Sequence, residues 1–148
     1  MNGMVVLDTS VVVKWFRQEE KGARYALAYR NAYLEGQISI VLPDLALYEL
    51  ANVLCHKRDL TVEQIVQALD SLLEMELLWA DPSAELLARA VRVARQCQVT
   101  LYDAVFVALA QWMGAPLVTA DEYLVRQTTC EVMVQQLGQE VAGPPTSP

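Results

Sequence analysis

Residues 100–121, TLYDAVFVALAQWMGAPLVTAD, contain a helix, a turn and a strand in one short stretch. Leu101 to Met113 is apolar on every side of a helix, which is typical of helices buried inside a fold. Its only charged residue is Asp103. A short strand, Leu117 to Thr119, follows the turn and ends just before Asp121. A buried helix joined closely to a strand predicts an α/β fold.

Strands and helices alternate along the rest of the chain. This alternation predicts a parallel sheet covered by helices on both faces. In such sheets, ligands bind beyond the carboxyl ends of the strands, where the strand order reverses. The expected strands are Met4–Leu7, Ile38–Leu42, Leu77–Ala80, Leu117–Thr119 and Glu131–Val134. The expected helices are Lys21–Leu34, one capped by Asp44 and running to Leu54, one opened by a Thr61–Gln64 capping box, one with Pro82 in its first position, and the buried helix between Thr100 and Gly114.

The length and composition indicate a single soluble domain. The chain has 148 residues, 54% of them hydrophobic, enough to bury a core without disulfides or metals as staples. We expect this domain to span residues 1–137, and the Gly- and Pro-rich tail 138–148 to be disordered. The first residues lack a secretory signal, and no apolar run reaches the roughly 20 residues of a membrane span. We therefore expect a cytoplasmic protein.

The cysteines and the single histidine do not indicate a site. Cys55, Cys97 and Cys130 are widely spaced and form no CxxC pattern, so we interpret them as buried free thiols. His56, followed by two basic residues, is expected to end a helix, where positive charge is favourable.

Four carboxylates stand where an apolar run ends or is interrupted: Asp8, Glu49, Asp103 and Asp121. A buried carboxylate needs a positive partner or must lose its charge. The chain has only eleven Lys and Arg against eighteen acids, and none lies within these four apolar runs. If the fold brings the four acids together, a divalent cation is the remaining source of positive charge.

Each acid except Glu49 also has a purely structural explanation. Asp8 and Asp121 could cap the helices that follow them. Asp103 lies three residues after Thr100, the spacing of a capping box. Glu49 is too far inside its helix to cap it, and it lies on the apolar stripe.

The ligand types indicate which metal and which chemistry. Carboxylates without His or Cys suit Mg²⁺ or Mn²⁺. Such sites are typical of phosphate chemistry, and the sequence has no Gly-rich phosphate-binding loop of a nucleoside triphosphatase. Hydrolysis of a phosphodiester is the favoured reaction.

Four motifs, in this order, resemble the PIN-domain ribonucleases, and most closely the VapC-type toxins of toxin–antitoxin pairs. They are LDTSVVVKW at 7–15, PDLALYELANVL at 43–54, TLYDAVFVALA at 100–110 and LVTADEYL at 117–124. The resemblance implies a three-layer α/β/α sandwich, dependence on Mg²⁺ or Mn²⁺, and endonucleolytic cleavage of RNA. It also implies a homodimer and a small antitoxin protein as partner.

The family's acidic residues fall on the four carboxylates already selected. By the resemblance, Asp8 and Asp103 hold the metal directly, Asp121 is a further or water-mediated ligand, and Glu49 orients or deprotonates the attacking water. Two hydroxyls are expected to hydrogen-bond the ligating carboxylates: Ser10 and Thr119. The family often has another acid a few residues after the last Asp, whereas here Glu122 adjoins it directly, so we assign Glu122 at most an outer position.

The net charge of −7 is unusual for a protein that binds nucleic acid. Two groups of basic residues could contact a phosphate backbone or simply form solvated surface. One is Arg89, Arg92 and Arg95, on one helical ridge; the other is Lys14, Arg17, Lys21 and Arg24, of which Lys14 could face the scissile phosphate.

Three other functions compete with the toxin hypothesis. The first is a PIN nuclease of RNA processing, and the second is an inactive binding module whose acids only cap helices. The third is a phosphoacceptor of the response-regulator type. It needs a Lys after a late strand, where this chain has LVTADE.

Overall fold

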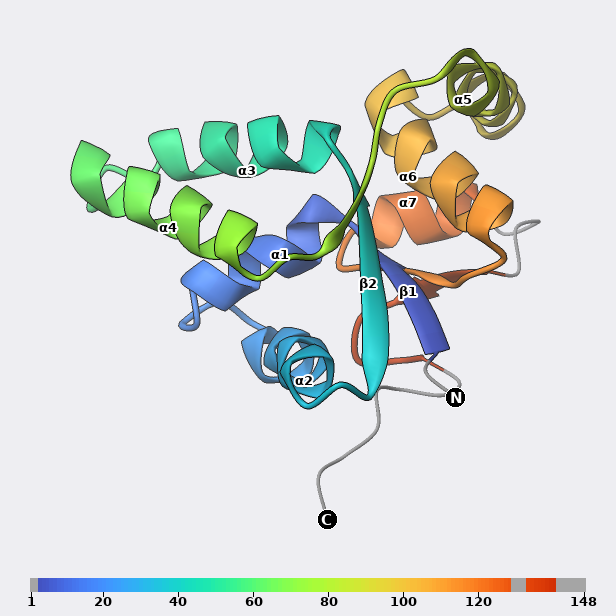
Figure 1. The fold of residues 1–148 in the computed structure, drawn as a ribbon. Coiled ribbons are helices and arrows are strands. Elements are labelled where there is room, and N and C mark those ends of the chain that lie inside the picture. Colours follow the sequence, from blue (N-terminus) through green and yellow to red (C-terminus); the bar gives the residue numbers. More distant parts are fainter. Residues whose placement is uncertain (1–2, 129–132, 141–148) are drawn as a thin grey trace.

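The computed structural model describes residues 3–128 and 133–140. In this part of the chain, five parallel strands form one sheet in the order β3-β2-β1-β4-β5 (Figure 1). The strands are β1 (Gly3–Leu7), β2 (Ile38–Pro43), β3 (Leu78–Ala80), β4 (Leu117–Thr119) and β5 (Val134–Gln136). The parallel sheet predicted from the alternating pattern is confirmed.

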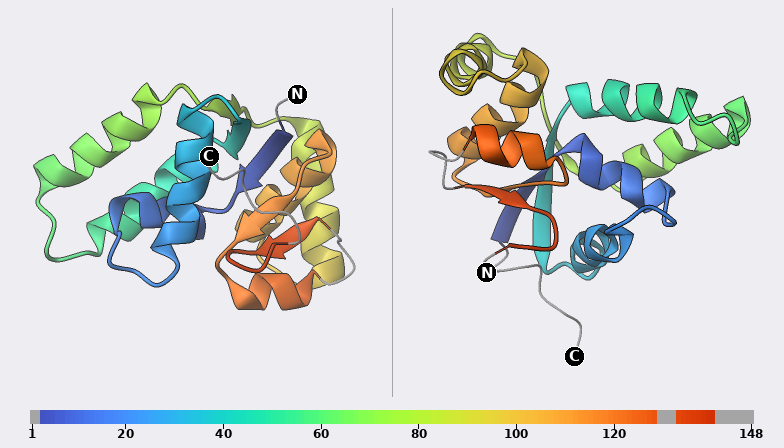
Figure 2. Two further views of the ribbon diagram at one scale, coloured as in Figure 1. Left: turned by 90° about the horizontal axis from the view of Figure 1, so that it is seen from below. Right: turned by 180° about the vertical axis from the view of Figure 1, so that it is seen from behind.

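Helices cover both faces of the sheet, which gives the predicted α/β/α layers. Helices α1 to α4 lie on one face and α5 to α7 on the other (Figures 1 and 2). The outermost helices, α4 and α5, pack against α3 and α6 respectively. The bounds are α1 (Thr9–Phe16), α2 (Ala23–Leu34), α3 (Leu45–Cys55), α4 (Val62–Glu74), α5 (Ala84–Cys97), α6 (Leu101–Met113) and α7 (Glu122–Gln127).

The core forms around β1 and α6. β1 is the central strand, and Val6 and Leu7 are fully buried in it. The middle of α6, from Ala104 to Ala110, is buried on all sides, as its sequence predicts. Its two ends differ, because Tyr102 and Trp112 are exposed. The helix is therefore buried only where it crosses the sheet.

The strand order reverses between β1 and β4. From β1 the chain moves outward to β2 and β3, and then returns on the other side to add β4 and β5. All carboxyl ends lie on the same edge of the sheet because the strands are parallel. The predicted acids Asp8 and Asp121 follow β1 and β4, so they flank the position where α/β folds place a ligand.

Several helix ends agree with the sequence. Thr61 and Gln64 form the expected capping box at the start of α4. The hydroxyl of Thr100 accepts a hydrogen bond from the backbone N–H of Asp103, and Gly114 ends α6 with a φ of 63°. His56 stands at the end of α3 as predicted.

Two local predictions, both about helix starts, were wrong. Asp44 precedes α3 but makes no capping hydrogen bond, because its backbone is already helical (φ −53°, ψ −31°). Pro82 is not in the first turn of α5, since the Ser83 hydroxyl caps that helix by accepting from the Leu86 N–H. Only Met133 and Val134 of the expected last strand, Glu131–Val134, lie among the described residues, where β5 spans Val134–Gln136.

The chain after β5 is described as far as residue 140. Gly138 packs closely against the ring of Tyr25, and Glu140 accepts a hydrogen bond of 3.1 Å from the Tyr29 hydroxyl. Burial and the Glu140 charge raise the pKa of Tyr29. Residues 141–148, the rest of the predicted tail, lie outside the described residues.

Two further predictions concern thiols and membranes. Cys97 is buried, whereas Cys55 is exposed, which corrects the expectation that it is buried; Cys130 lies outside the described residues. Cys55 is exposed because it lies in the last turn of α3, away from that helix's buried residues. None of the helices in the described ranges is both long and apolar enough to cross a membrane.

Candidate active site

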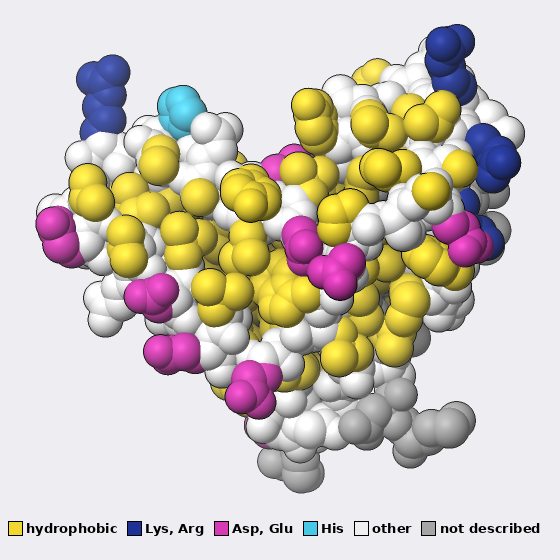
Figure 3. Space-filling model, turned by 45° about the horizontal axis from the view of Figure 1, so that its top comes forward, with side chains coloured by type: hydrophobic (Ala, Val, Ile, Leu, Met, Phe, Trp, Pro, Cys, Tyr) yellow, Lys and Arg dark blue, Asp and Glu magenta, His cyan; other side chains and the backbone are white. Residues whose placement is uncertain are grey.

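The four predicted acids come together at the carboxyl edge of the sheet, where α1, α3, α6 and α7 begin. Figure 3 views this end of the molecule. Its face carries carboxylates among hydrophobic side chains, whereas the Lys and Arg side chains gather at its outer edges. None of the four acids has a Lys, Arg or His within ion-pair distance in the described part of the chain.

Asp8 is the most deeply buried of the four, with only 7% of its surface exposed. It precedes α1 but makes no capping hydrogen bond. Its Oδ2 accepts instead from the hydroxyls of Ser10, at 2.6 Å, and Thr119, at 2.9 Å. The capping explanation of Asp8 therefore fails. Burial raises the pKa of Asp8, and the two hydroxyl hydrogen bonds partly offset this rise.

Backbone groups after β4 fix both hydroxyls in their orientation. The Ala120 N–H donates to Ser10 Oγ at 2.9 Å, and the Asp121 N–H donates to Thr119 Oγ1 at 3.1 Å. Each hydroxyl has one proton, and because it accepts from the backbone it can give that proton to Asp8. The structure thus places Ser10 and Thr119 against Asp8, in the contacts expected of them.

Glu49 projects from α3 toward α1 and is half-buried. Its Oε1 accepts a hydrogen bond of 2.7 Å from the hydroxyl of Thr9. Sequence reasoning missed Thr9, although it lies between Asp8 and Ser10. The available signal was a second hydroxyl in the DTS triplet, on the residue that points away from Ser10.

The negative charges of the four acids act on one another. Burial raises the pKa of Glu49, and the charges of Asp8 and Asp103 raise it further. Burial also raises the pKa of Asp103, as do the charges of Asp8 and Asp121. The fold has therefore gathered like charges that repel one another, and this repulsion costs stability in the absence of a cation.

Asp121 caps a helix, as its structural explanation requires. Its Oδ1 accepts from the backbone N–H groups of Tyr123, at 2.9 Å, and Leu124, at 3.3 Å, at the start of α7. Its Oδ2 makes no hydrogen bond among the described residues. Capping thus uses one oxygen of Asp121 and leaves the other able to bind a ligand.

The oxygen donors of this cluster suit Mg²⁺ or Mn²⁺, but they do not form a closed ligand set. Carboxylates are the ligands that hard divalent cations prefer, and the cluster lacks positive charge. Among the described residues, however, no three His, Cys, Asp or Glu side chains lie close enough together to hold a metal ion as they stand. The residues fit such an ion in chemistry, and direct binding by three of them would require side-chain rotation or intervening water. The metal-binding roles of the four acids remain predictions.

Comparison with known proteins identifies the family. The chain matches the family model of the PIN domain over residues 5–128. It belongs to the PIN domain family. Ribonuclease VapC3 of Pyrobaculum aerophilum is 32% identical over 127 residues, which cover 83% of this chain and 93% of that protein.

Solved PIN domain structures have the same fold. VapC20 of Mycobacterium tuberculosis, a toxin that cleaves the sarcin–ricin loop, superposes with a TM-score of 0.65 at 14% identity, covering 95% of this chain and 99% of that one. A DNA-bound VapBC complex of Salmonella typhimurium gives a TM-score of 0.66 at 14% identity, over 93% of this chain and 99% of that one. The resemblance to VapC-type PIN domains predicted from the four motifs is confirmed.

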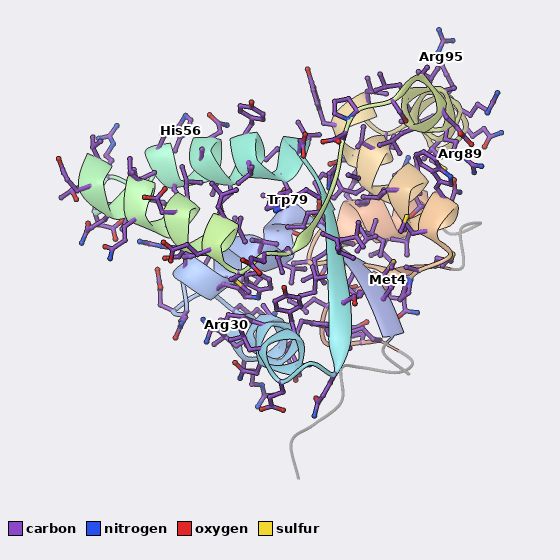
Figure 4. The ribbon with its side chains drawn as sticks, viewed as in Figure 1. Met4, Arg30, His56, Trp79, Arg89 and Arg95 are labelled. Carbon is purple, nitrogen blue, oxygen red and sulfur yellow. The ribbon has the colours of Figure 1, made fainter. Side chains whose placement is uncertain are left out.

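Most basic residues of this PIN domain lie away from the acids. Arg95 projects outward from α5, Arg89 lies 5.9 Å from the ring of Trp112 in α6, and His56 points away from the sheet at the end of α3 (Figure 4). Arg17 contacts Asp59 at 2.7 Å, and Lys14 lies 3.4 Å from Glu20. Arg89 likewise lies 3.6 Å from Glu85. These acidic partners favour the interpretation of both basic groups as ordinary surface, although Lys14 and Lys21 also line a pocket next to Ala120.

Proposed function

We propose that this chain is a Mg²⁺- or Mn²⁺-dependent endoribonuclease that hydrolyses RNA phosphodiester bonds. The observation that supports it best is the cluster of Asp8, Glu49, Asp103 and Asp121, buried or half-buried acids that have no basic side chain of the described residues within ion-pair distance. Maintaining such a cluster is costly unless a positive group completes it. The similarity to Ribonuclease VapC3 gives the reaction class.

The four acids are expected to have different roles, because the protein holds some of them more firmly than others. Asp8 is fixed by two oriented hydroxyls, so it is the best-placed fixed ligand for an ion. Asp103 and the second carboxylate oxygen of Asp121 are the further acidic groups near Asp8, since the charges of Asp8 and Asp121 act on Asp103. A bound Mg²⁺ or Mn²⁺ would offset the carboxylate charges and lower the pKa of water at the site.

Glu49 is the group best suited to handle a proton. Burial and its acidic neighbours raise its pKa, which makes Glu49 a stronger base than an exposed carboxylate. The Thr9 hydroxyl holds one of its oxygens, at 2.7 Å, which leaves the other to orient a water molecule and accept its proton. The water would then attack the scissile phosphorus and form a new P–O bond, while the bond to the leaving sugar oxygen breaks and that oxygen takes up a proton from solvent.

We further propose that the protein is a cytoplasmic toxin that forms a homodimer and binds a small antitoxin protein. Apolar side chains support a protein partner, because Tyr48 and Val62 are exposed by 74% and 71%. Expression alone should stop growth, and coexpression of a small protein encoded beside it should restore growth. A nuclease of RNA processing would not arrest growth in this way.

The capping hydrogen bonds of Asp121 are the observation that favours the inactive binding module. An RNA cleavage assay with Mg²⁺, Mn²⁺ and EDTA arms separates the two functions. We expect cleavage in both metal arms and none in EDTA. Asp121→Asn should keep the helix cap, since Asn caps about as well as Asp, and should lose activity. The nuclease proposal would be contradicted by the absence of cleavage in every arm. It would also be contradicted by cleavage that is the same with metal and with EDTA and is lost to the same extent in each arm when the protein is heated.

A further inference from the structure

A polar pocket adjoins the acid cluster on its β4–β5 side. It has a volume of about 380 Å³, within the range of about 300–1,000 Å³ typical of small-molecule sites. Its walls come from the end of α1, the segment before α2, the start of α7 and the chain after β5. Ala120, the residue between Thr119 and Asp121, lines it. A strand of RNA held at the acids would therefore pass this pocket with its next nucleotide.

The walls of the pocket are held together by contacts across the chain. The Leu137 N–H donates to the Thr119 carbonyl at 2.7 Å, which ties the segment after β5 to β4. Gly22 has a φ of +82°, and a Cβ there would lie 3.6 Å from Leu137 Cδ2, so the start of α2 packs directly on this segment. The pocket is a built feature of the fold.

One side of the pocket is positively charged. It carries Lys14 and Lys21, two of the three lysines in the chain. Lys14 lies one helical turn after Ser10 and so faces the same side of α1 as the hydroxyl on Asp8. Its ammonium group is 3.4 Å from Glu20 and its side chain is only 12% exposed. Ammonium groups bind phosphate well, so this side suits the sugar–phosphate backbone.

The other side offers hydrogen-bonding groups suited to the edge of a base. Glu122 and Gln136 lie together there, with Gln136 Nε2 3.3 Å from Glu122 Oε1. A carboxylate accepts two adjacent N–H donors, and guanine alone among the RNA bases presents N1–H and N2–H side by side. The second N–H of the Gln136 amide can then donate to guanine O6. Single-stranded bases are read on this edge.

The aromatic side chain that lines the pocket, Tyr25, already contacts other groups. The Arg24 guanidinium covers one side of the ring at 4.7 Å, and Gly138 packs closely on the ring, where a Cβ would come within 3.1 Å. Binding would depend on charge and hydrogen bonds, without the gain that base stacking gives to many RNA sites. A single nucleotide should bind weakly and lose affinity with added salt.

We propose that this pocket binds one nucleotide of single-stranded RNA beside the bond to be cleaved, and that it prefers guanine. Lys14 and Lys21 bind the phosphate, and Glu122 with Gln136 binds the base. The inference rests on the proposed nuclease function for its substrate, but its binding test does not depend on cleavage.

The test uses metal-free protein in EDTA, titrated with 5′-GMP, 5′-AMP, 5′-CMP and 5′-UMP while backbone amide shifts are recorded. We expect GMP to bind most tightly and to shift Ala120, Gly22 and Gln136. Lys21→Ala should weaken all four nucleotides about 3- to 10-fold, since it removes one charged contact to phosphate. Glu122→Gln should abolish the preference for GMP over AMP. Arg58→Ala is the matched control: it removes one exposed positive charge outside the pocket and should change nothing.

The outcomes separate this inference from the proposed function. GMP binding at these residues in a protein that cleaves no RNA would support the pocket and reject the nuclease. Metal-dependent cleavage, with no nucleotide shift at the pocket and with an unchanged KM in Lys21→Ala and Glu122→Gln, would reject the pocket alone. Equal weakening by Arg58→Ala would also reject it, because the effect would then reflect overall charge.

Discussion

Two groups of carboxylates in this molecule have opposite surroundings. Between the α1–α2 and α3–α4 loops, Asp59 receives both Nη atoms of Arg17, at 2.7 and 3.3 Å, and this hydrogen bonding lowers the pKa of Asp59. At the carboxyl edge of the sheet, burial raises the pKa values of Asp8 and Glu49, and the charges of Asp8 and Asp103 raise that of Glu49 further.

The difference shows which acids support the fold and which await a ligand. An exposed, paired acid such as Asp59 helps to join two loops, and its charge is already balanced. The acids near Asp8 carry charge that the protein itself does not balance, at a cost to stability. Acids that were only structural would be paired or exposed. Substitutions that remove charge from one group and leave the other intact test this distinction.

The largest expected effect is on the rate of RNA cleavage, when one acid of each group is replaced by Asn. Asp8→Asn should reduce RNA cleavage at least about 100-fold, because a lost contact to a catalytic ion removes several kcal/mol of transition-state stabilisation. Asp59→Asn, the matched control, should cleave at the wild-type rate. The measurement is kcat on a single-stranded RNA. Wild-type cleavage by Asp8→Asn would remove Asp8 from the mechanism.

The next effect is stabilisation by metal. At a Mn²⁺ concentration of 100 times Kd, the folded protein should gain about 2.7 kcal/mol, which for a domain of this size raises Tm by about 5–10 °C. The gain should persist in Asp59→Asn and disappear in Asp8→Asn, as followed by circular dichroism. An equal shift in all three proteins would indicate that Mn²⁺ binds elsewhere.

Local signals in the sequence were sufficient for the elements that carry the site. The apolar run before Asp8 gave β1, and Thr100 and Gly114 marked both ends of α6. Predicted helix starts were wrong where two nearby residues could both begin the helix. Pro82 and Ser83 are both good helix starters, and the side chain of Ser83 decided where α5 begins. The cap expected from Asp44 failed because a strand leads directly into α3.

Contacts between residues far apart in the sequence could be predicted only in part. The four acids were selected because each stands where an apolar run ends or is interrupted. The hydrogen bond from Thr9 to Glu49 joins residues 40 positions apart, and the second hydroxyl of the DTS triplet does not by itself indicate that Glu49 is its partner. The pocket beside the acids likewise depends on where the chain after β5 passes α2, which the sequence pattern does not fix.

Thr9→Val should have the third-largest effect. Valine keeps the shape of this buried side chain but removes the donor to Glu49, and loss of such a supporting hydrogen bond costs about 10-fold or more in activity. The loss should appear in kcat with little change in KM, and Thr9→Ser should restore most of it. A rise in KM alone would mean that Thr9 shapes substrate binding instead of positioning Glu49.

The smallest effect is a dependence of stability on pH in the absence of metal. Asp8, Glu49 and Asp103 have raised pKa values, so between their unfolded and folded values the folded state holds more protons than the unfolded state. Stability from these groups is therefore complete below the ordinary pKa of about 4 and is lost as pH rises through the raised folded values. Asp59 has the opposite sign, because its contribution is lost as pH falls through its lowered pKa.

Chemical denaturation in EDTA, from pH 4 to pH 8, compares the wild type with Asp8→Asn. Groups common to both proteins cancel in the difference, apart from the relief that Glu49 and Asp103 gain when the Asp8 charge is removed. We expect Asp8→Asn to become more stable relative to the wild type as pH rises, and the difference then to become constant. Asp59→Asn should show no such gain above pH 4. A wild type that gains stability over Asp8→Asn with rising pH would mean that a cation within the protein already balances the Asp8 carboxylate, and the argument for a metal would fail with it.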